Sequence, residues 1–147
     1  FGINQSIITT HLKNNSFNNN RSQLIKTKNN QIILDAYNAN PSSMLTAIKN
    51  FLKINVSVKK TLIIGDMLEL GKESGFLHQE IVDFLNITKT EKCILVGDIF
   101  FKTNSEFQKF KSKKSLEEFL IKNTIKNNLI LIKGSRNMAL ETLKKSL

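Results

Sequence analysis

The chain has 147 residues and a formal net charge of +10, from 22 Lys and Arg against 12 Asp and Glu, and 40% of its residues are hydrophobic. This length is enough for one ordinary core, and no apolar stretch approaches the roughly 20 residues that a membrane helix needs. The first residues lack the pattern of a secretory signal, and a single cysteine, Cys93, cannot form an internal disulfide. We therefore expect a soluble cytoplasmic protein, with Cys93 buried in a strand.

The first third of the chain is predicted to contain a helix, a loop, a short hairpin and a second helix. Apolar residues share one helical face over residues 3–12, and the Asn-rich stretch "NNSFNNN" then interrupts the pattern. The turn signal "KNN" separates two apolar runs, which predicts a hairpin near residues 23–35. Residues 41–53 have helical spacing, with Asn40 as the N-cap and Pro41 at the first position, where its missing N–H costs nothing.

Strands and helices alternate over the remainder of the chain. Strands are predicted at residues 60–65, 92–97, 107–110 and 128–133. Helices are predicted at residues 74–86, at 115–125 after a capping box of Ser115 and Glu118, and over a last segment with Leu140, Leu143 and Leu147. This order implies right-handed crossovers, and therefore an α/β fold with a Rossmann-like, mainly parallel sheet flanked by helices on both faces.

Polar residues follow four of the predicted strands. They are Asp35, Tyr37 and Asn38 after the hairpin, the turn "DMLELG" at residues 66–71, Asp98, and the turn "GSR" at residues 134–136. In an open parallel sheet the ligand crevice lies beyond the carboxyl ends of the strands, so we expect these turns to meet at one edge. Each alone has a structural alternative: Asp66 and Asp98 suit ordinary turns, and Ser135 suits the cap of the last helix.

Several motifs of complete active sites are absent from the sequence. In "KGSR" the lysine precedes the glycine, the wrong order for a Walker A phosphate loop, and there is no G-x-G-x-x-G fingerprint. No Cys/His cluster has metal-ligand spacing, and the two histidines, His11 and His78, have no paired nucleophile. On an amphipathic helix His78 is most simply a surface or boundary residue. The chain looks like half of an active site, without a metal site.

Three motifs resemble, in order and spacing, those of the carboxyl-terminal domain of the Mur ligases. They are "LDAYNANPSSM", "IIGDMLELGKESGFLH" and "IKGSRNMALE". Within this family they resemble the members that add D-alanyl-D-alanine to UDP-N-acetylmuramoyl-tripeptide in peptidoglycan synthesis. The resemblance covers residues 21–147, and residues 1–20 are similar to the tail and linker of the family's central ATPase domain.

The resemblance implies a chemistry that this chain does not complete alone. In the family, the central domain holds ATP and Mg²⁺, the substrate carboxylate becomes an acyl phosphate, and the amine of the dipeptide attacks it to form an amide. The carboxyl-terminal domain closes over this site. The implied partners are ATP, D-alanyl-D-alanine and UDP-N-acetylmuramoyl-tripeptide, with no nucleic acid and no membrane, and the expected state is a monomer.

The resemblance also implies roles for particular residues. The residues that would bind the nucleotide are Arg21, Asp35, Tyr37 and Asn38. Of these, Arg21 and Asp35 would lie at the ribose and phosphate side, and Asn38 would lie near the adenine. The residues that would face the dipeptide or the transferring phosphoryl group are Lys133, Ser135 and Arg136. The residues that would line the substrate cleft are Asp66, Glu69 and His78. Cations suit carboxylate and phosphate oxygens, and a carboxylate suits ribose hydroxyls.

The sequence departs from the family pattern at two positions and leaves two other function classes open. Leu34 stands where many relatives have a second acidic residue, and Asn20 stands where a proline often precedes the arginine. One alternative is a folylpolyglutamate synthase-like ligase of the same superfamily. The other is a basic nucleic-acid-binding module, although the lysines are spread along the chain and the aromatic residues are mostly Phe, with one Tyr and no Trp.

Overall fold

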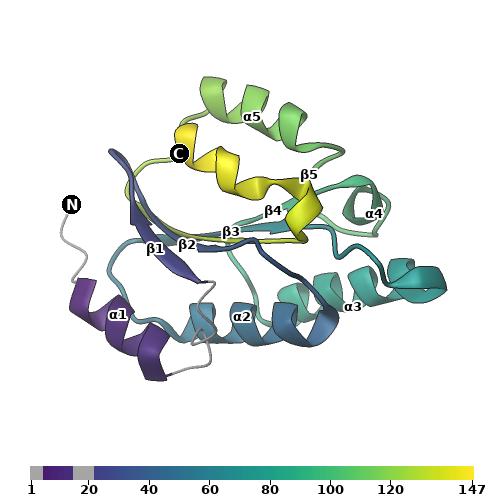
Figure 1. The fold of residues 1–147 in the computed structure, drawn as a ribbon, viewed down its shortest axis with the longest axis horizontal. Coiled ribbons are helices and arrows are strands. Elements are labelled where there is room, and N and C mark those ends of the chain that lie inside the picture. The colour runs from purple at the N-terminus through teal and green to yellow at the C-terminus, as the bar shows by residue number, and fades with distance from the viewer. Residues whose placement is uncertain (1–4, 15–21) are drawn as a thin grey trace.

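The computed structural model describes residues 5–14 and 22–147 (Figure 1). The helices are α1 (Gln5–Asn14), α2 (Pro41–Lys53), α3 (Ser74–Ile87), α4 (Asp98–Phe101) and α5 (Lys113–Lys122). The strands are β1 (Gln23–Lys26), β2 (Gln31–Asp35), β3 (Lys59–Gly65), β4 (Cys93–Val96), β5 (Gln108–Phe110) and β6 (Asn128–Lys133). Three 3₁₀ segments complete the chain: η1 (Gly71–Glu73), η2 (Arg136–Met138) and η3 (Leu140–Lys145).

The strands form one six-stranded sheet in the order β1-β2-β6-β3-β4-β5. The first strand, β1, is antiparallel to β2, and all the other neighbours are parallel. The β1–β2 hairpin closes where the Thr27 N–H donates to the Asn30 carbonyl at 2.9 Å. The predicted hairpin and the mainly parallel α/β sheet are both confirmed.

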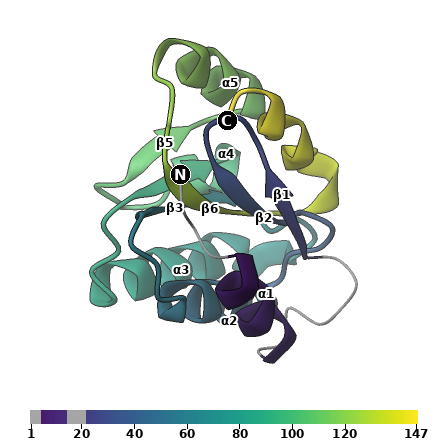
Figure 2. The same cartoon turned by 90° about the vertical axis from the view of Figure 1, so that its left-hand side faces the viewer.

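Helices cover the two faces of this sheet (Figures 1 and 2). On one side lie α1, α2 and α3, and on the other lie α5 and η3. Successive residues of a strand point to opposite faces, so Leu129 and Leu131 of β6 pack in the core on the α1–α3 side while Ile130 and Ile132 pack on the α5 side. Because both faces of the sheet are buried, β6 is a nearly continuous apolar run rather than an alternating one.

The start of α2 has the predicted cap. The Asn40 side chain accepts a hydrogen bond from the Ser43 N–H at 2.8 Å, and the Ser43 hydroxyl accepts one from the Asn40 N–H at 3.1 Å. Pro41 occupies the first helical position. The reciprocal pair satisfies two of the N–H groups left free at a helix start. Asn40 therefore ends the turn that follows β2 and fixes where α2 begins.

Two of the predicted helices differ from the structure. The capping box predicted for Ser115 and Glu118 is wrong, because α5 begins at Lys113 and Ser112 is its N-cap, with Ser115 as the reciprocal partner. Both serines fit the cap pattern, and only the fold selects the earlier one. The last segment forms 3₁₀ turns instead of one helix, broken at Ala139, whose backbone is left-handed (φ 48°).

The two remaining structural predictions concern Cys93 and the division of the chain at residue 20. Cys93 is buried in β4 as predicted, and burial raises the pKa of its thiol. Residue 20 lies outside the described residues, so the division stays a prediction. Ile8 of α1 is fully buried in the core on the α1–α3 side. Ile8 therefore joins α1 to the core on this side of the sheet.

Candidate functional site at the carboxyl edge of the sheet

The turns after β2, β3, β4 and β6 lie at one edge of the sheet, as the sequence predicts, because these strands are parallel. Backbone hydrogen bonds join the ends of β3, β4 and β6 directly. The Ser135 N–H donates to the Asp66 carbonyl at 3.1 Å, and the Asp66 N–H donates to the Val96 carbonyl at 3.0 Å. The β3 and β6 ends approach closely, since a Cβ on Gly134 would lie 3.1 Å from the Cα of Gly65. The turns at residues 35–40, 66–71, 97–98 and 134–136 thus form one surface at this edge of the sheet, the platform.

Asp35 and Lys133 form an ion pair at the ends of β2 and β6. The two residues are register partners on neighbouring parallel strands, and Lys133 Nζ lies 2.8 Å from Asp35 Oδ2. Lys133 Nζ also donates to the Asn38 carbonyl at 3.0 Å. The lysine is only 1% exposed, whereas the Asp35 side chain is 16% exposed. The acidic residue therefore reaches the surface, and the lysine lies beneath it.

Tyr37 and Arg136 form a second link between the same two turns. The Arg136 guanidinium carbon lies 5.1 Å from the centroid of the Tyr37 ring, in the geometry of a cation–π contact. Tyr37, Asn38 and Arg136 are all exposed. A ligand can reach these three side chains and the exposed part of the Asp35 carboxylate at this end of the platform.

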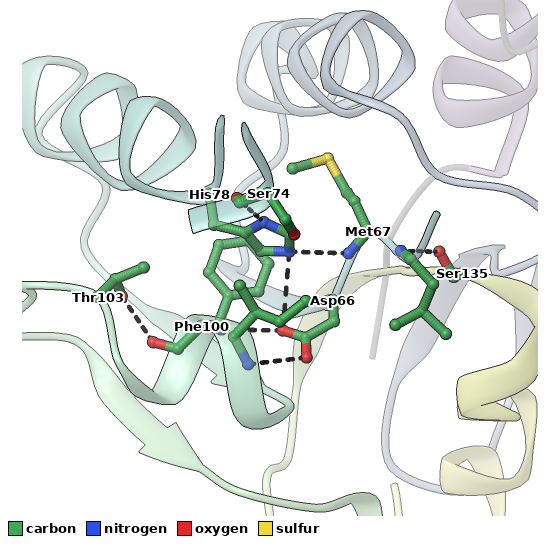
Figure 3. Close-up of polar contacts among 9 residues, drawn as sticks. Asp66, Met67, Ser74, His78, Phe100, Thr103 and Ser135 are labelled. Carbon is green, nitrogen blue, oxygen red and sulfur yellow. Dashed lines mark hydrogen bonds and ion pairs between the residues drawn. The ribbon is translucent and has the colours of Figure 1, made fainter. Parts of the chain in front are cut away.

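The Asp66 carboxylate is directed into the protein and caps the short helix α4. Its two oxygens accept hydrogen bonds from the Ile99 N–H at 3.0 Å and the Phe100 N–H at 2.9 Å (Figure 3). Gly97 makes this close approach possible, because a Cβ there would lie 2.2 Å from the Asp66 carboxyl carbon. Asp98, which the sequence also proposed, is exposed at the first position of α4. The buried carboxylate is therefore used in capping.

His78 supports the turn after β3 from inside the protein and has no exposed surface. Its Nε2 accepts a hydrogen bond from the Met67 N–H at 2.9 Å, so Nδ1 carries the proton and donates to the Ser74 carbonyl at 2.6 Å (Figure 3). Burial lowers the pKa of His78, although the Ser74 carbonyl and the Asp66 carboxylate 3.8 Å away act in the opposite direction. The neutral ring orders the turn, and His78 is a core residue where a surface or boundary position was expected.

Ser135 holds the turn after β3 through its side chain. Its hydroxyl accepts a hydrogen bond from the Leu68 N–H at 2.8 Å and makes no cap contact with the three-residue segment η2. Ser135 thus stands at the N-cap position of η2, as its structural alternative supposed, but its side chain bonds the turn after β3 in place of a cap. Glu69, one residue beyond Leu68, is exposed and has a left-handed backbone (φ 68°). The anchored turn presents Glu69 to solvent next to the platform.

Among the described residues, one hollow lies at each end of the strands. One of about 330 Å³ lies at the carboxyl edge, between the beginning of α3 and α4, and is lined by Ser74, Gly75, Gln79, Ile99, Lys102 and Thr103. The other, of about 430 Å³, is lined in part by Lys59, Lys60 and Lys92 at the amino ends of β3 and β4. Only the first hollow borders the turns that carry the predicted site residues.

Comparison with known proteins identifies the family. Residues 20–136 match the family model for the Mur ligase, glutamate ligase domain. The chain belongs to this family. This Mur ligase domain is 35% identical over 97% of its length to a UDP-N-acetylmuramoyl-tripeptide–D-alanyl-D-alanine ligase of Rickettsia prowazekii, and 36% identical over 86% to the ligase of the same name from Bacillus subtilis. It spans 33% and 30% of those relatives.

A solved structure resembles most of the chain. A MurF ligase from Thermotoga maritima, in complex with ADP, matches 86% of this Mur ligase domain with a TM-score of 0.69 and 25% identity. The domain covers 30% of that protein. The resemblance inferred from the three motifs is thus confirmed at the level of the family and its fold.

The structure places the predicted site residues of this Mur ligase domain that it describes at or beneath the carboxyl edge of the sheet; Arg21 lies outside the described residues. The sequence did not reveal which residues would be internal. Phe100, for example, packs edge-on against the His78 ring at a centroid distance of 4.5 Å, and no motif indicated this contact. Within residues 5–14 and 22–147, no group of three or more His, Cys, Asp or Glu side chains could hold a metal ion, and no helix is long and apolar enough to span a membrane.

Proposed function

We propose that this chain is the carboxyl-terminal domain of an ATP-dependent ligase that joins D-alanyl-D-alanine to UDP-N-acetylmuramoyl-tripeptide. The observation that carries the proposal is the platform of joined turns, whose accessible groups are an acid, an aromatic ring and a cation, in a chain about 35% identical to ligases of that name. Because the chain spans about a third of those relatives, the activity belongs to the longer protein.

The proposed reaction needs groups that bind a nucleotide and groups that bind an anionic acceptor. The substrate carboxylate takes the terminal phosphoryl group of ATP and releases ADP; the dipeptide amine then attacks the acyl carbon and releases phosphate. On this platform the exposed rim of Asp35 suits ribose hydroxyls, and the Tyr37 ring suits the flat face of a base. The Arg136 guanidinium suits a phosphate or the dipeptide carboxylate, and Glu69 is also exposed at this edge of the sheet.

Several predicted site residues support this surface from inside. Asp66, His78 and Ser135 hold the turn that presents Glu69, through the contacts to α4, Met67 and Leu68. As the resemblance implies, we place Mg²⁺ and most of the contacts to the ATP phosphates on other parts of the longer protein. We further propose that the protein works as a cytoplasmic monomer.

The test is an assay of the longer protein with ATP, D-alanyl-D-alanine and UDP-N-acetylmuramoyl-tripeptide, with mass spectrometry of the product. We expect ATP-dependent formation of the amide, and no ATP hydrolysis or amide formation by the 147-residue chain alone. Glutamate with a folate acceptor tests the folylpolyglutamate synthase alternative. Extension of the folate, or turnover by the isolated chain, would contradict the proposal.

Binding to random-sequence DNA tests the nucleic-acid alternative. A module that binds through phosphate contacts loses affinity steeply as salt is raised. We expect no such binding by the 147-residue chain near physiological salt. A specific, salt-dependent complex would favour the basic module.

A further inference from the structure

We infer that Lys133 is a positioning residue for the nucleotide site, which holds Asp35 and the turn at residues 36–40 in place, and that it does not contact the dipeptide or the transferring phosphoryl group. This inference rests on the proposed function. The resemblance implied that the lysine of "KGSR" faces a ligand. The inference gives the role of the ligand-facing cation at this end of the platform to Arg136 of the same motif.

The strand geometry places Lys133 on the side of the sheet away from the α5 layer. Side chains alternate along β6, so Lys133 follows Leu129 and Leu131 toward the α1–α3 side. Asp35 follows Ile33 to the same side of β2. The two side chains are register neighbours there, beneath the turn that leads into α2. This placement results from the register of two strands and needs no ligand.

The contacts of the ammonium group leave little room for a ligand. A lysine ammonium has three N–H donors, and two of them are directed to Asp35 Oδ2 at 2.8 Å and the Asn38 carbonyl at 3.0 Å. The residue is 1% exposed, so a phosphate or carboxylate oxygen would have to enter the core to reach the third. Arg136 of the same motif is exposed on the Tyr37 ring.

The two contacts of Lys133 act on different parts of the proposed nucleotide site. The ion pair fixes the orientation of the Asp35 carboxylate, and the bond to the Asn38 carbonyl fixes the backbone of the turn that carries Tyr37 and Asn38. A buried ammonium between two such acceptors also compensates for the desolvation of the carboxylate. Loss of Lys133 should therefore weaken nucleotide binding without removing a group that acts on the reacting atoms.

The first experiment measures steady-state kinetics of the longer protein with Lys133→Met. We expect the KM for ATP to rise on the order of tenfold or more, because a charge-assisted contact that orders the site is lost. The KM for D-alanyl-D-alanine and kcat at saturating ATP should change little. A large fall in kcat with an unchanged KM for ATP, or a raised KM for the dipeptide, would overturn the inference.

Lys113→Met is a matched control. Lys113 is a half-buried lysine that likewise has two acceptors, the Ala139 carbonyl at 3.3 Å and the Thr142 hydroxyl at 2.8 Å, but it joins the start of α5 to η3, and neither acceptor lies in the turn at residues 36–40. We expect Lys113→Met to leave both KM values unchanged. A rise in the KM for ATP as large as that of Lys133→Met would show a general effect of lost stability and overturn the inference.

A double variant covers the case in which Lys133→Met does not fold. Asp35→Asn with Lys133→Met removes both charges, which buried pairs often tolerate better than the loss of one. Through the Asp35 contact the double variant should resemble Asp35→Asn alone, and the lost bond to the Asn38 carbonyl should add a smaller further rise in the KM for ATP. A rise in the KM for D-alanyl-D-alanine beyond that of Asp35→Asn would overturn the inference.

Amide hydrogen exchange in the 147-residue chain separates this inference from the proposed function. We expect Lys133→Met to speed exchange at residues 36–40 more than Lys113→Met does, because the turn loses its anchor. If the longer protein makes no amide with D-alanyl-D-alanine, the proposed function fails, and the exchange result still decides whether Lys133 holds the turn. Unchanged exchange at residues 36–40 would overturn the inference by itself.

Discussion

The Ser135 hydroxyl accepts a hydrogen bond from the Leu68 backbone N–H at 2.8 Å, and the Ser135 N–H donates to the Asp66 carbonyl at 3.1 Å. Two reciprocal bonds therefore join the turns after β6 and β3, which lie 67 residues apart in the chain. The residue is only 7% exposed. Ser135 acts first on the shape of the platform, and any contact with a ligand comes in addition.

Replacement of Ser135 by alanine should lower the free energy of unfolding by about 1–3 kcal/mol, because the Leu68 N–H loses its partner. Urea denaturation of the 147-residue chain measures this loss, and Ser42→Ala, an exposed serine in the first turn of α2, is the control that should change little. An unchanged free energy of unfolding would contradict the structural role.

Kinetics of the same Ser135→Ala variant in the longer protein test the role implied by the resemblance. If Ser135 faces the dipeptide, the KM for D-alanyl-D-alanine should rise far more than the KM for ATP. If both KM values stay unchanged while stability falls, Ser135 is purely structural.

His78 should make the stability of the domain depend on pH. Burial lowers the pKa of His78 in the folded state, whereas an unfolded histidine titrates near 6.5. Below about pH 6.5 the unfolded chain binds a proton at His78 that the folded chain does not bind. The free energy of unfolding therefore decreases as the pH is lowered, by up to about 1.4 kcal/mol per pH unit. Denaturation between about pH 5 and pH 8 measures the slope.

His78→Gln should remove this part of the slope, and His11→Gln is the control because His11 is the other histidine of the chain. The glutamine variant should also be less stable near pH 8, where the neutral ring accepts the Met67 N–H. A slope that is the same with and without His78 would contradict the assignment.

Gly97 should not tolerate a side chain. Its φ of 123° lies in a region that favours glycine, and a Cβ would meet the Asp66 carboxylate. Gly97→Ala should therefore cost at least about 2 kcal/mol in the free energy of unfolding. Gly75→Ala in α3 is the control, since nothing lies within 4 Å of the added Cβ, and it should stabilise by up to about 1 kcal/mol. Similar thermal melting curves for the two variants would be inconsistent with this geometry.

Asp35→Ala in the longer protein should weaken the interaction with ATP on the order of ten- to a hundredfold, because a charged hydrogen-bond partner is lost. The change also leaves Lys133 buried without its carboxylate, so the melting temperature should fall. Steady-state kinetics with ATP varied and a melting curve measure the two effects. A lowered melting temperature with unchanged KM and kcat would assign Asp35 to structure alone.

Much of the fold could be predicted from the sequence, because its signals are local. The spacing of apolar residues located the strands and most helices, and the pair of Asn40 and Pro41 marked the start of α2. The cap of α5 was misplaced because Ser112 and Ser115 offer the same local pattern. The 3₁₀ turns near the carboxyl terminus were also missed, since Ala139 adopts a left-handed backbone that no local signal required.

The sequence by itself determined the order of strands and helices, the edge at which the polar turns meet, and the family. Only the tertiary structure decided which polar side chains face a ligand. Asp35 and Lys133 are 98 residues apart, and Asp66 and Ile99 are 33 apart. A buried charge or N–H group needs a partner that the fold brings to it, whereas hydrophobic spacing and caps act between neighbours. For this reason the motif "KGSR" indicated a site, but only the packing separated its buried lysine and serine from its exposed arginine.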